Sequence, residues 1–137
     1  MTAYLLDTST LIDIIRNKPD SVNFLQNNVK EKLFTSIICV VELLEGANLS
    51  KNIKVEKTLI DNAIKAINPP LLFDNQQAEI AGQIRSMLRK IGQKIDDFDT
   101  LIAASAIATN STLVTTNLKH FTRIPNLRLL NVSKPNS

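Results

Sequence analysis

Short apolar segments alternate with longer helical patterns along this chain of 137 residues. Such segments are too short for helices and are typical of buried strands. We predict strands at residues 3–6, 33–35, 71–73, 113–115 and 127–130. Buried strands separated by helices indicate an α/β fold, in which a short parallel sheet is flanked by helices on both faces.

The segments between these strands carry the start and stop residues of helices. Asp7-Thr8-Ser9-Thr10 is a good helix start, and Pro19 fits the first turn of a second helix that ends near residue 28. Ser36 is expected to cap a helix that carries Glu42 and stops at Gly46. Longer helices are expected at residues 53–67, 75–91 (ended by Gly92) and 97–109.

The composition allows one ordinary domain with an aliphatic core. Hydrophobic residues are 44% of the chain and charged residues 21%, which is a normal globular balance, while aromatic residues are only 4%. We expect a single domain at residues 1–132 and a frayed tail at residues 133–137. The net charge of +3 is, by itself, weak evidence for a nucleic-acid partner.

Neither a signal peptide nor a membrane span is readable in the sequence. The chain begins Met1-Thr2-Ala3-Tyr4, without a basic segment, and no apolar run approaches the ~20 residues needed to cross a bilayer. Cys39 is the only cysteine, which excludes a disulfide framework and a thiolate metal cluster. We therefore expect a soluble cytoplasmic protein.

Acidic residues stand beside or inside three of the apolar segments. Asp7 follows residues 3–6 directly, and Glu42 has two apolar residues on each side. Asp96, Asp97 and Asp99 precede the apolar residues 101–104. Carboxylates are seldom buried unless they are paired. A divalent cation shared by the three segments is the simplest partner.

Two spacings suggest that these acids converge. Asp7 and Thr116-Asn117 both follow predicted strands, so they should lie at the same edge of a parallel sheet, where ligands bind. Asp96 and Asp99 are three residues apart and share a helix face. Oxygen ligands of this kind suit Mg²⁺ or Mn²⁺ rather than zinc. His120 is the only histidine, and we expect it at the surface.

Ordinary explanations exist for each acid taken alone. Asp7 could cap the following helix, Glu42 could face solvent, and the three later aspartates could favour a helix N-terminus. Two other acid-based chemistries fit less well. A haloacid-dehalogenase-type phosphatase needs a second aspartate where this chain has Ser9. A phospho-accepting receiver domain has no comparably convincing pattern in this chain.

Four ordered motifs stand out along the chain: Leu5-Leu6-Asp7-Thr8-Ser9, Val41-Glu42-Leu43-Leu44-Glu45-Gly46-Ala47, Asp99-Thr100-Leu101-Ile102-Ala103-Ala104 and Val114-Thr115-Thr116-Asn117-Leu118-Lys119-His120-Phe121. In these motifs the chain resembles PIN domains and, more narrowly, the VapC toxins of bacterial toxin–antitoxin modules. Shorter matches lie at residues 82–85, 92–95 and 124–128. The resemblance covers essentially the whole chain, and its strength lies in the order and spacing of the motifs.

This resemblance implies a PIN-like fold and an endoribonuclease that uses Mg²⁺ or Mn²⁺. Asp7, Glu42 and Asp99 match the three family acids, and Asn117 matches the position of a fourth acid or an asparagine. We expect Asp96 to supplement the metal site and Asp97 to be a helix N-cap. In mechanism, a carboxylate such as Glu42 or Asp99 would orient or deprotonate the attacking water.

An acidic pocket repels RNA, so a basic rim must hold the phosphate backbone. The candidates are Arg85, Arg89, Lys94 and Lys119, with Arg16, Lys18, Lys90 and Arg123 as further members. The resemblance also implies a VapB-type antitoxin, whose tail lies in a groove of the toxin, and a homodimer. Two alternatives remain open, which are a PIN-like protein that binds RNA or a partner without cleaving it, and a DNA nuclease.

Overall fold

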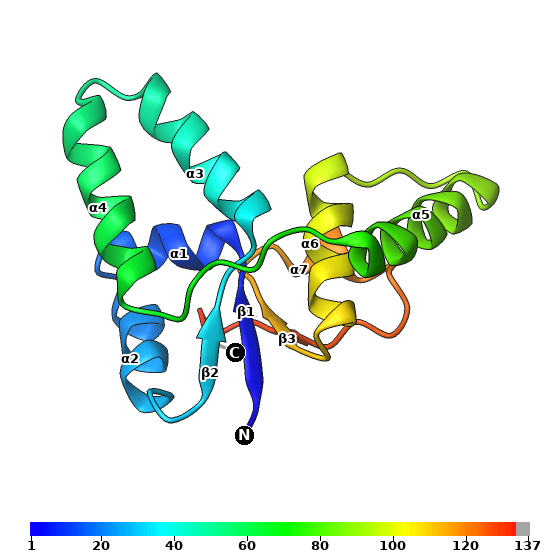
Figure 1. The fold of residues 1–137 in the computed structure, drawn as a ribbon, viewed down its shortest axis with the longest axis horizontal. Coiled ribbons are helices and arrows are strands. Elements are labelled where there is room, and N and C mark those ends of the chain that lie inside the picture. Colours follow the sequence, from blue (N-terminus) through cyan, green and yellow to red (C-terminus); the bar gives the residue numbers. More distant parts are fainter. Residues whose placement is uncertain (134–137) are drawn as a thin grey trace.

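A computed structural model describes residues 1–133 of the chain, and most of the predicted tail at 133–137 lies outside the described residues. Within that range the strands are β1 (Ala3–Leu6), β2 (Lys32–Phe34), β3 (Thr112–Val114) and β4 (Leu129–Leu130). The helices are α1 (Thr8–Ile15), α2 (Pro19–Asn27), α3 (Ile37–Leu49), α4 (Ile53–Lys65), α5 (Asn75–Lys90), α6 (Asp97–Ala108) and α7 (Leu118–Phe121). Figure 1 shows α1 to α4 gathered beside β2, and α5 and α6 beside β3.

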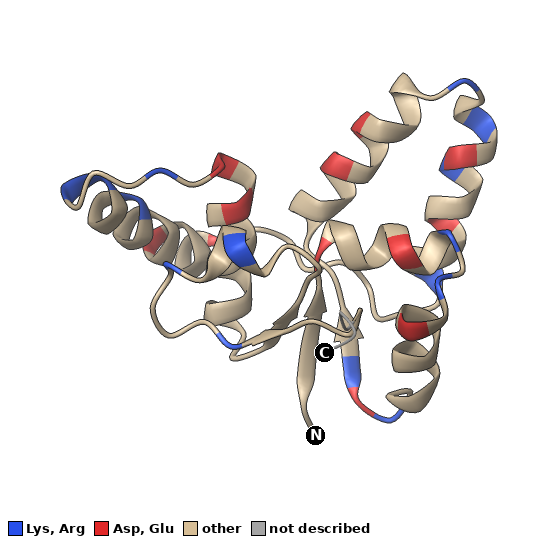
Figure 2. Cartoon of the chain, turned by 180° about the vertical axis from the view of Figure 1, so that it is seen from behind, with Lys and Arg blue, Asp and Glu red and all other residues tan. Residues whose placement is uncertain are grey.

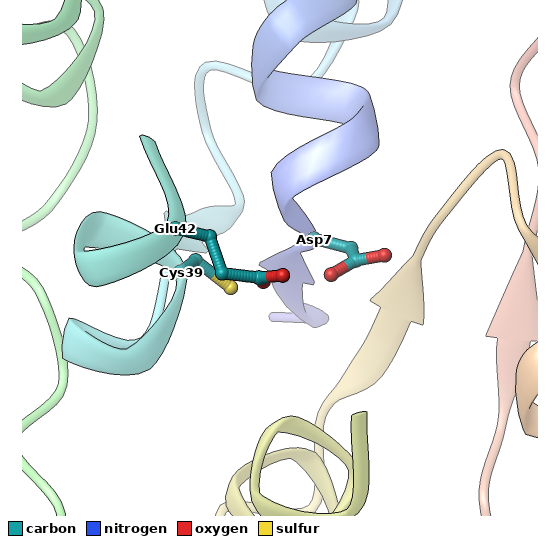
Figure 3. A group of neighbouring side chains, drawn as sticks. All are labelled: Asp7, Cys39 and Glu42. Carbon is teal, nitrogen blue, oxygen red and sulfur yellow. The ribbon is translucent and has the colours of Figure 1, made fainter. Parts of the chain in front are cut away.

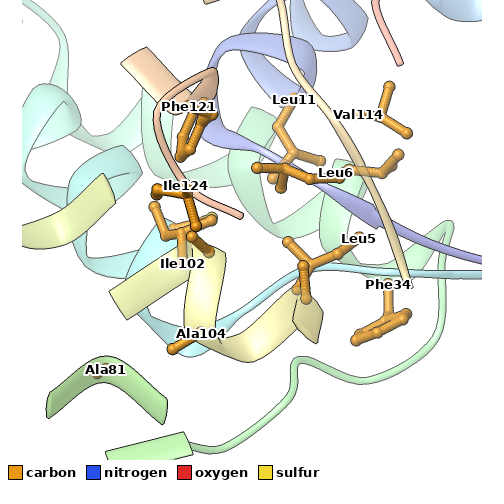
Figure 4. Close-up of a cluster of buried hydrophobic side chains, with 14 of the residues drawn as sticks. Leu5, Leu6, Leu11, Phe34, Ala81, Ile102, Ala104, Val114, Phe121 and Ile124 are labelled. Atoms are coloured by element: carbon orange, nitrogen blue, oxygen red, sulfur yellow. The ribbon is translucent and has the colours of Figure 1, made fainter. Parts of the chain in front are cut away.

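The strands form one parallel sheet, as the apolar runs predicted, and their order is β2-β1-β3-β4. Neighbours along a strand point to opposite faces of the sheet. Leu5 and Leu6 are both fully buried, and so are Leu113 and Val114. Both faces of the two central strands are therefore covered. Figure 4 shows part of this core, which is mostly aliphatic.

The strand order creates an opening at one edge of the sheet. From β1 the chain runs through α1 and α2 to β2 on one side, whereas from β3 it runs through α7 to β4 on the other. The segments that follow β1 and β3 therefore diverge at the carboxyl ends of these neighbouring strands. This divergence is the topological switch point at which open α/β sheets bind ligands.

One predicted helix end is wrong, because α3 continues past Gly46 to Leu49. A glycine ends a helix when it takes a positive φ, and Gly46 does not. Leu43 and Ala47, four residues apart, are both buried, and α3 packs against α4. This packing carries the helix through the glycine. The predicted cap holds, since the Ser36 hydroxyl accepts a hydrogen bond from the Ile38 amide.

The predicted strand at residues 71–73 is also wrong. Of these three residues, Leu71 alone forms a strand-like pair, which is an isolated parallel bridge to Ser36, two residues after the end of β2. Pro69 and Pro70 lack the N–H groups that would extend the ladder upstream, and Asp74 caps α5 immediately downstream. Among residues 1–133, no helix combines the length and apolar character needed to cross a membrane.

Candidate metal centre

Asp7 lies at the opening between β1 and β3, where the sheet ends. Its side chain is 3% exposed. Asp7 occupies the N-cap position of α1, but its carboxylate makes no side-chain cap hydrogen bond to the helix. Instead, Oδ2 accepts a hydrogen bond of 2.7 Å from the Thr115 hydroxyl, across the gap to the end of β3. The helix-cap explanation of Asp7 therefore does not account for its position.

A small hydroxyl network fixes this carboxylate. The Ser9 and Thr115 hydroxyls lie 3.2 Å apart. The Thr116 amide donates to Ser9 Oγ and the Asn117 amide to Thr115 Oγ1, each at 3.0 Å. The network ties the turn after β1 to the turn after β3. The sequence analysis missed Ser9 and Thr115 as supporting residues, although both lie in the motifs that contain Asp7 and Asn117.

Glu42 reaches the same place from α3. Its Oε1 accepts a hydrogen bond of 2.6 Å from the Thr8 hydroxyl, in the first turn of α1. One ligand atom each of Asp7, Glu42 and Cys39 lies within 4.8 Å of the others. Figure 3 shows the three side chains pointing toward one another. Burial raises the pKa of the Cys39 thiol to about 12, so the thiol stays protonated. The ligand atoms offered here are thus carboxylate oxygens.

Asp99 and Asp96 complete the acidic set from the start of α6. They line one cavity of about 270 Å³ together with Asp7, Glu42, Asn117, His120, Thr8, Ser9 and Ile12. The convergence that the sequence predicted for Asp7, Glu42, Asp99, Asp96 and Asn117 is therefore present. This lining contains four carboxylates and no lysine or arginine.

His120 is a site residue that the sequence analysis missed. Its side chain is 55% exposed, as expected for a surface residue, but Nδ1 lies 3.0 Å from Asp99 Oδ2. His120 belongs to α7, a four-residue helix too short for its periodicity to be recognised. The Val114–Phe121 motif contains His120, and this was the sequence signal that could have marked His120 as a site residue.

The helix-cap role that was predicted for Asp97 belongs to Asp96. Asp96, not Asp97, is the N-cap of α6, and its Oδ1 accepts hydrogen bonds from the Phe98 and Asp99 amides. Asp97 is the first residue of the helix and pairs with Arg85 outside the cavity. A one-residue shift in the helix start explains the error, because helix ends are the least defined part of a periodic pattern.

The electrostatics of the cavity favour a bound cation. Burial raises the pKa of Asp7, Glu42 and Asp99. Asp7 raises the pKa of the other two further, while the hydroxyl of Thr115 lowers that of Asp7 only in part. Like charges held together in this way are stabilised by a shared cation. An all-oxygen set fits Mg²⁺ or Mn²⁺.

We expect the metal-free protein to become more stable as the pH falls from 7 toward 5. A carboxyl whose folded pKa is raised costs stability when ionised, and that cost is recovered as the pH falls through the raised pKa toward ordinary values of 3.8 to 4.5. Arg85 lowers the pKa of Asp97, so the stability that ionised Asp97 contributes is lost only at pH values below this range. Thermal melts in EDTA should show a midpoint that rises as the pH is lowered through this range, and a midpoint that falls instead would contradict the electrostatics described.

The predicted basic residues do not line the acidic cavity. Arg85, Arg89 and Lys94 line a separate hollow on the other side of the α6 first turn. Lys119 belongs to α7. Arg16 lines a hollow that shares Ile12 and Glu42 with the acidic cavity, and it pairs with Glu56 at 3.3 Å. Lys18 lies 3.8 Å from Asp13.

A parallel sheet with four carboxylates gathered beside the carboxyl ends of β1 and β3 is an α/β domain with a candidate metal centre. The family model for "PIN domain" matches residues 4–127. The chain belongs to the PIN domain family, and within it to the VapC proteins, as the following relatives show.

Two curated relatives cover nearly the whole chain. The chain is 33% identical over 129 residues to "tRNA(fMet)-specific endonuclease VapC" of Salmonella typhimurium, and the match covers 94% of this chain and 97% of that protein. It is 36% identical over 133 residues to "Ribonuclease VapC2" of Rickettsia felis, covering 96% and 98%. The crystal structure of VapBC2 from Rickettsia felis bound to a promoter DNA fragment superposes with a TM-score of 0.90 and 32% identity, covering 95% of this chain and 98% of that one.

Proposed function

We propose that this chain is a Mg²⁺- or Mn²⁺-dependent endoribonuclease and the toxin of a type II toxin–antitoxin module. The observation that carries the proposal is the convergence of Asp7, Glu42, Asp96 and Asp99 on one cavity without a lysine or arginine. The names of the VapC relatives, a ribonuclease and a tRNA endonuclease, support RNA as the substrate. Their similarity extends over nearly the whole of each chain, so the proposal concerns the whole protein.

The residues divide the work of phosphodiester hydrolysis among them. When bound, the cation lowers the pKa of a water molecule and polarises a phosphate oxygen. Asp7, Glu42 and Asp99 would hold it, with Asp96 at the edge of the cavity. Glu42 or Asp99 would orient the attacking water or accept its proton, since both carboxylates line the cavity. Asn117 offers an uncharged amide that orients water. The expected products carry a 5′-phosphate and a 3′-hydroxyl.

The proposed partner is a VapB-type antitoxin, because the solved relatives are VapBC complexes. A hollow of about 170 Å³ between α1, α3 and α4 supports this part of the proposal. Its lining is apolar at Ile12, Leu43 and Ile60, and it reaches Glu42 of the acidic cavity. An antitoxin segment in this hollow would bring a basic side chain to the carboxylates. A homodimer and a cytoplasmic location, where RNA substrates are found, complete the proposal.

Cleavage should require an added divalent cation. We expect the purified chain to cut RNA with Mg²⁺ or Mn²⁺ and to stop in excess EDTA, because the carboxylates alone cannot activate water at neutral pH. The substrates are initiator tRNA, suggested by the Salmonella relative, an unrelated messenger RNA, and DNA of the same sequence. Labelled products resolved on denaturing gels give the rate. The Asp7→Asn variant, purified in the same way, controls for contaminating nuclease.

Each alternative predicts a different result in this assay. A non-catalytic RNA-binding protein would shift RNA in a native gel but release no metal-dependent product. A DNA nuclease would cut the DNA strand and leave RNA intact. RNA cleavage that persists undiminished in EDTA, and is absent from the Asp7→Asn preparation, would contradict metal dependence while leaving the nuclease assignment in place.

A further inference from the structure

Three basic side chains surround a second hollow, of about 320 Å³, beside the first turn of α6. Arg85 and Arg89 are four residues apart on α5 and therefore lie on the same face of that helix. Lys94 comes from the loop that joins α5 to α6. Figure 2 shows these Lys and Arg segments of α5 and its loop beside the acidic start of α6. The hollow is thus basic, next to an acidic cavity.

The backbone around this hollow is fixed by the way α5 ends. Gly92 has a φ of +70°, which a glycine adopts without strain. The Gln93 amide donates to the Leu88 carbonyl at 2.8 Å, and the Gly92 amide donates to the Arg89 carbonyl at 3.1 Å. These two bonds form a Schellman motif, which terminates the helix in a defined turn. The turn sets the direction of the loop that carries Lys94, so the three basic residues are grouped by the backbone.

The hollow carries an excess of positive charge that the fold does not use. Arg85 pairs with Asp97. Within residues 1–133, neither Arg89 nor Lys94 has an acidic partner within 4.0 Å. The lining has three cations and one carboxylate, and it therefore keeps a net charge of +2. A site of this kind suits an anion with several oxygens, because guanidinium groups bind phosphate through paired N–H donors.

The hollow and the acidic cavity lie on opposite sides of one helical turn. Asp97 lines the hollow and Asp99 lines the cavity. Two residues correspond to a rotation of about 200° around a helix and a rise of about 3 Å along it. A ligand that occupies both places must therefore pass around the start of α6. A strand of nucleic acid, with a phosphate at every residue, has the length and the repeating charge to do so.

Resting on the proposed function, we propose that the hollow between α5 and α6 binds a phosphate of the RNA backbone a short distance from the scissile bond. Arg89 and Lys94 contact this phosphate, and Asp97 holds the Arg85 guanidinium in place at its edge. The acidic cavity repels the substrate before it is cut, since its lining contains no lysine or arginine. Anchoring a neighbouring phosphate in a basic hollow offsets that repulsion without placing a cation among the metal ligands.

The test is the salt dependence of RNA binding by the full chain. The variant is Arg89→Gln/Lys94→Gln, and the matched control is Lys54→Gln/Lys57→Gln on α4, which removes the same charge elsewhere. The probe is a fluorescently labelled single-stranded RNA of mixed sequence, titrated by anisotropy in EDTA at several salt concentrations. Each cation that neutralises a phosphate of a single strand contributes about 0.7 to the logarithmic salt slope.

We expect the Arg89/Lys94 variant to bind RNA about tenfold or more weakly, with a salt slope reduced by about 0.7 because the two cations share one phosphate, and the α4 control to match the wild type. In cleavage assays the same variant should raise KM and leave kcat nearly unchanged, because the metal ligands are untouched. Equal salt slopes for the two double variants would overturn the inference and leave the hollow to another acidic ligand.

The inference and the proposed function fail in different ways. If wild-type protein cleaves RNA with metal while the Arg89/Lys94 variant binds and cleaves like the α4 control, the inference falls and the proposed function stands. If wild-type protein cleaves nothing but loses RNA affinity through these two substitutions, the phosphate site stands and the proposed nuclease activity falls. Circular dichroism melts of both variants confirm that each is folded.

Discussion

Replacing Asp7 with asparagine is expected to lower RNA cleavage by at least about 100-fold while the fold remains intact. Loss of residues that merely support a metal ligand costs about 10- to 100-fold, and Asp7 is proposed as a ligand itself. Asparagine has nearly the same shape, and its amide oxygen can still accept the hydrogen bond from Thr115. The metal-free variant should melt at the same or a higher temperature, because it lacks a buried carboxylate whose pKa is raised by burial.

The measurement pairs cleavage rate with thermal melting in EDTA. Asp20→Asn, at an exposed position in the first turn of α2, removes the same charge away from the cavity and is the matched control. Calorimetric titration with Mn²⁺ should show weakened binding for Asp7→Asn and unchanged binding for the control. An Asp7→Asn variant that unfolds would make Asp7 a structural residue and would remove the main support for the metal site.

The three aspartates around the start of α6 should differ widely in importance. Asp99→Asn is expected to lower cleavage by at least about 100-fold, because Asp99 faces the cavity and is 13% exposed. Asp96→Asn should be milder, since asparagine is an equally good N-cap and Asp96 lies at the cavity edge. Asp97→Asn should change the catalytic rate least, because its carboxylate pairs with Arg85 outside the cavity.

Substitution by alanine separates the capping role from the metal role. Asp96→Ala should cost about 1 kcal/mol of stability through loss of the N-cap, whereas Asp96→Asn should not. Asp97→Ala should change stability less than Asp96→Ala, because it removes only an exposed ion pair. Cleavage rates and urea unfolding of the five variants give the order. If Asp97→Asn lowered the cleavage rate most and Asp99→Asn left it unchanged, the face of α6 that is assigned to the cavity would be the wrong one.

The elements that carry the acids were predictable because local patterns define them. The residues 3–6 segment is apolar and buried on both faces, which marks a central strand of a parallel sheet without any tertiary information. The ends of such strands meet at one edge, so Asp7 and Asn117 could be placed together from order alone. Glu42 stood out because a charged residue with apolar neighbours on both sides is unusual for a solvated helix face.

Other features depend on contacts between distant residues and were not predictable. The hydrogen bond from Thr115 to Asp7 joins residues 108 apart, and neither residue alone predicts it. His120 meets Asp99 only because α7 turns back toward α6. The basic residues chosen from the sequence separated into an α5–α6 hollow and scattered surface positions, because charge alone does not say on which side of a helix a side chain lies.

The hydrogen bond between Thr115 and Asp7 has a consequence for the cell that synthesises this protein. The ribosome makes Asp7 108 residues before Thr115, whose hydroxyl holds it. Until β3 has emerged and paired with β1, Thr115 cannot hold Asp7 beside the carboxylates of α3 and α6. A nascent or truncated chain therefore lacks the assembled centre. On the proposed function, RNA cleavage therefore begins only after β3 has been made, when the proposed antitoxin has a folded surface to bind.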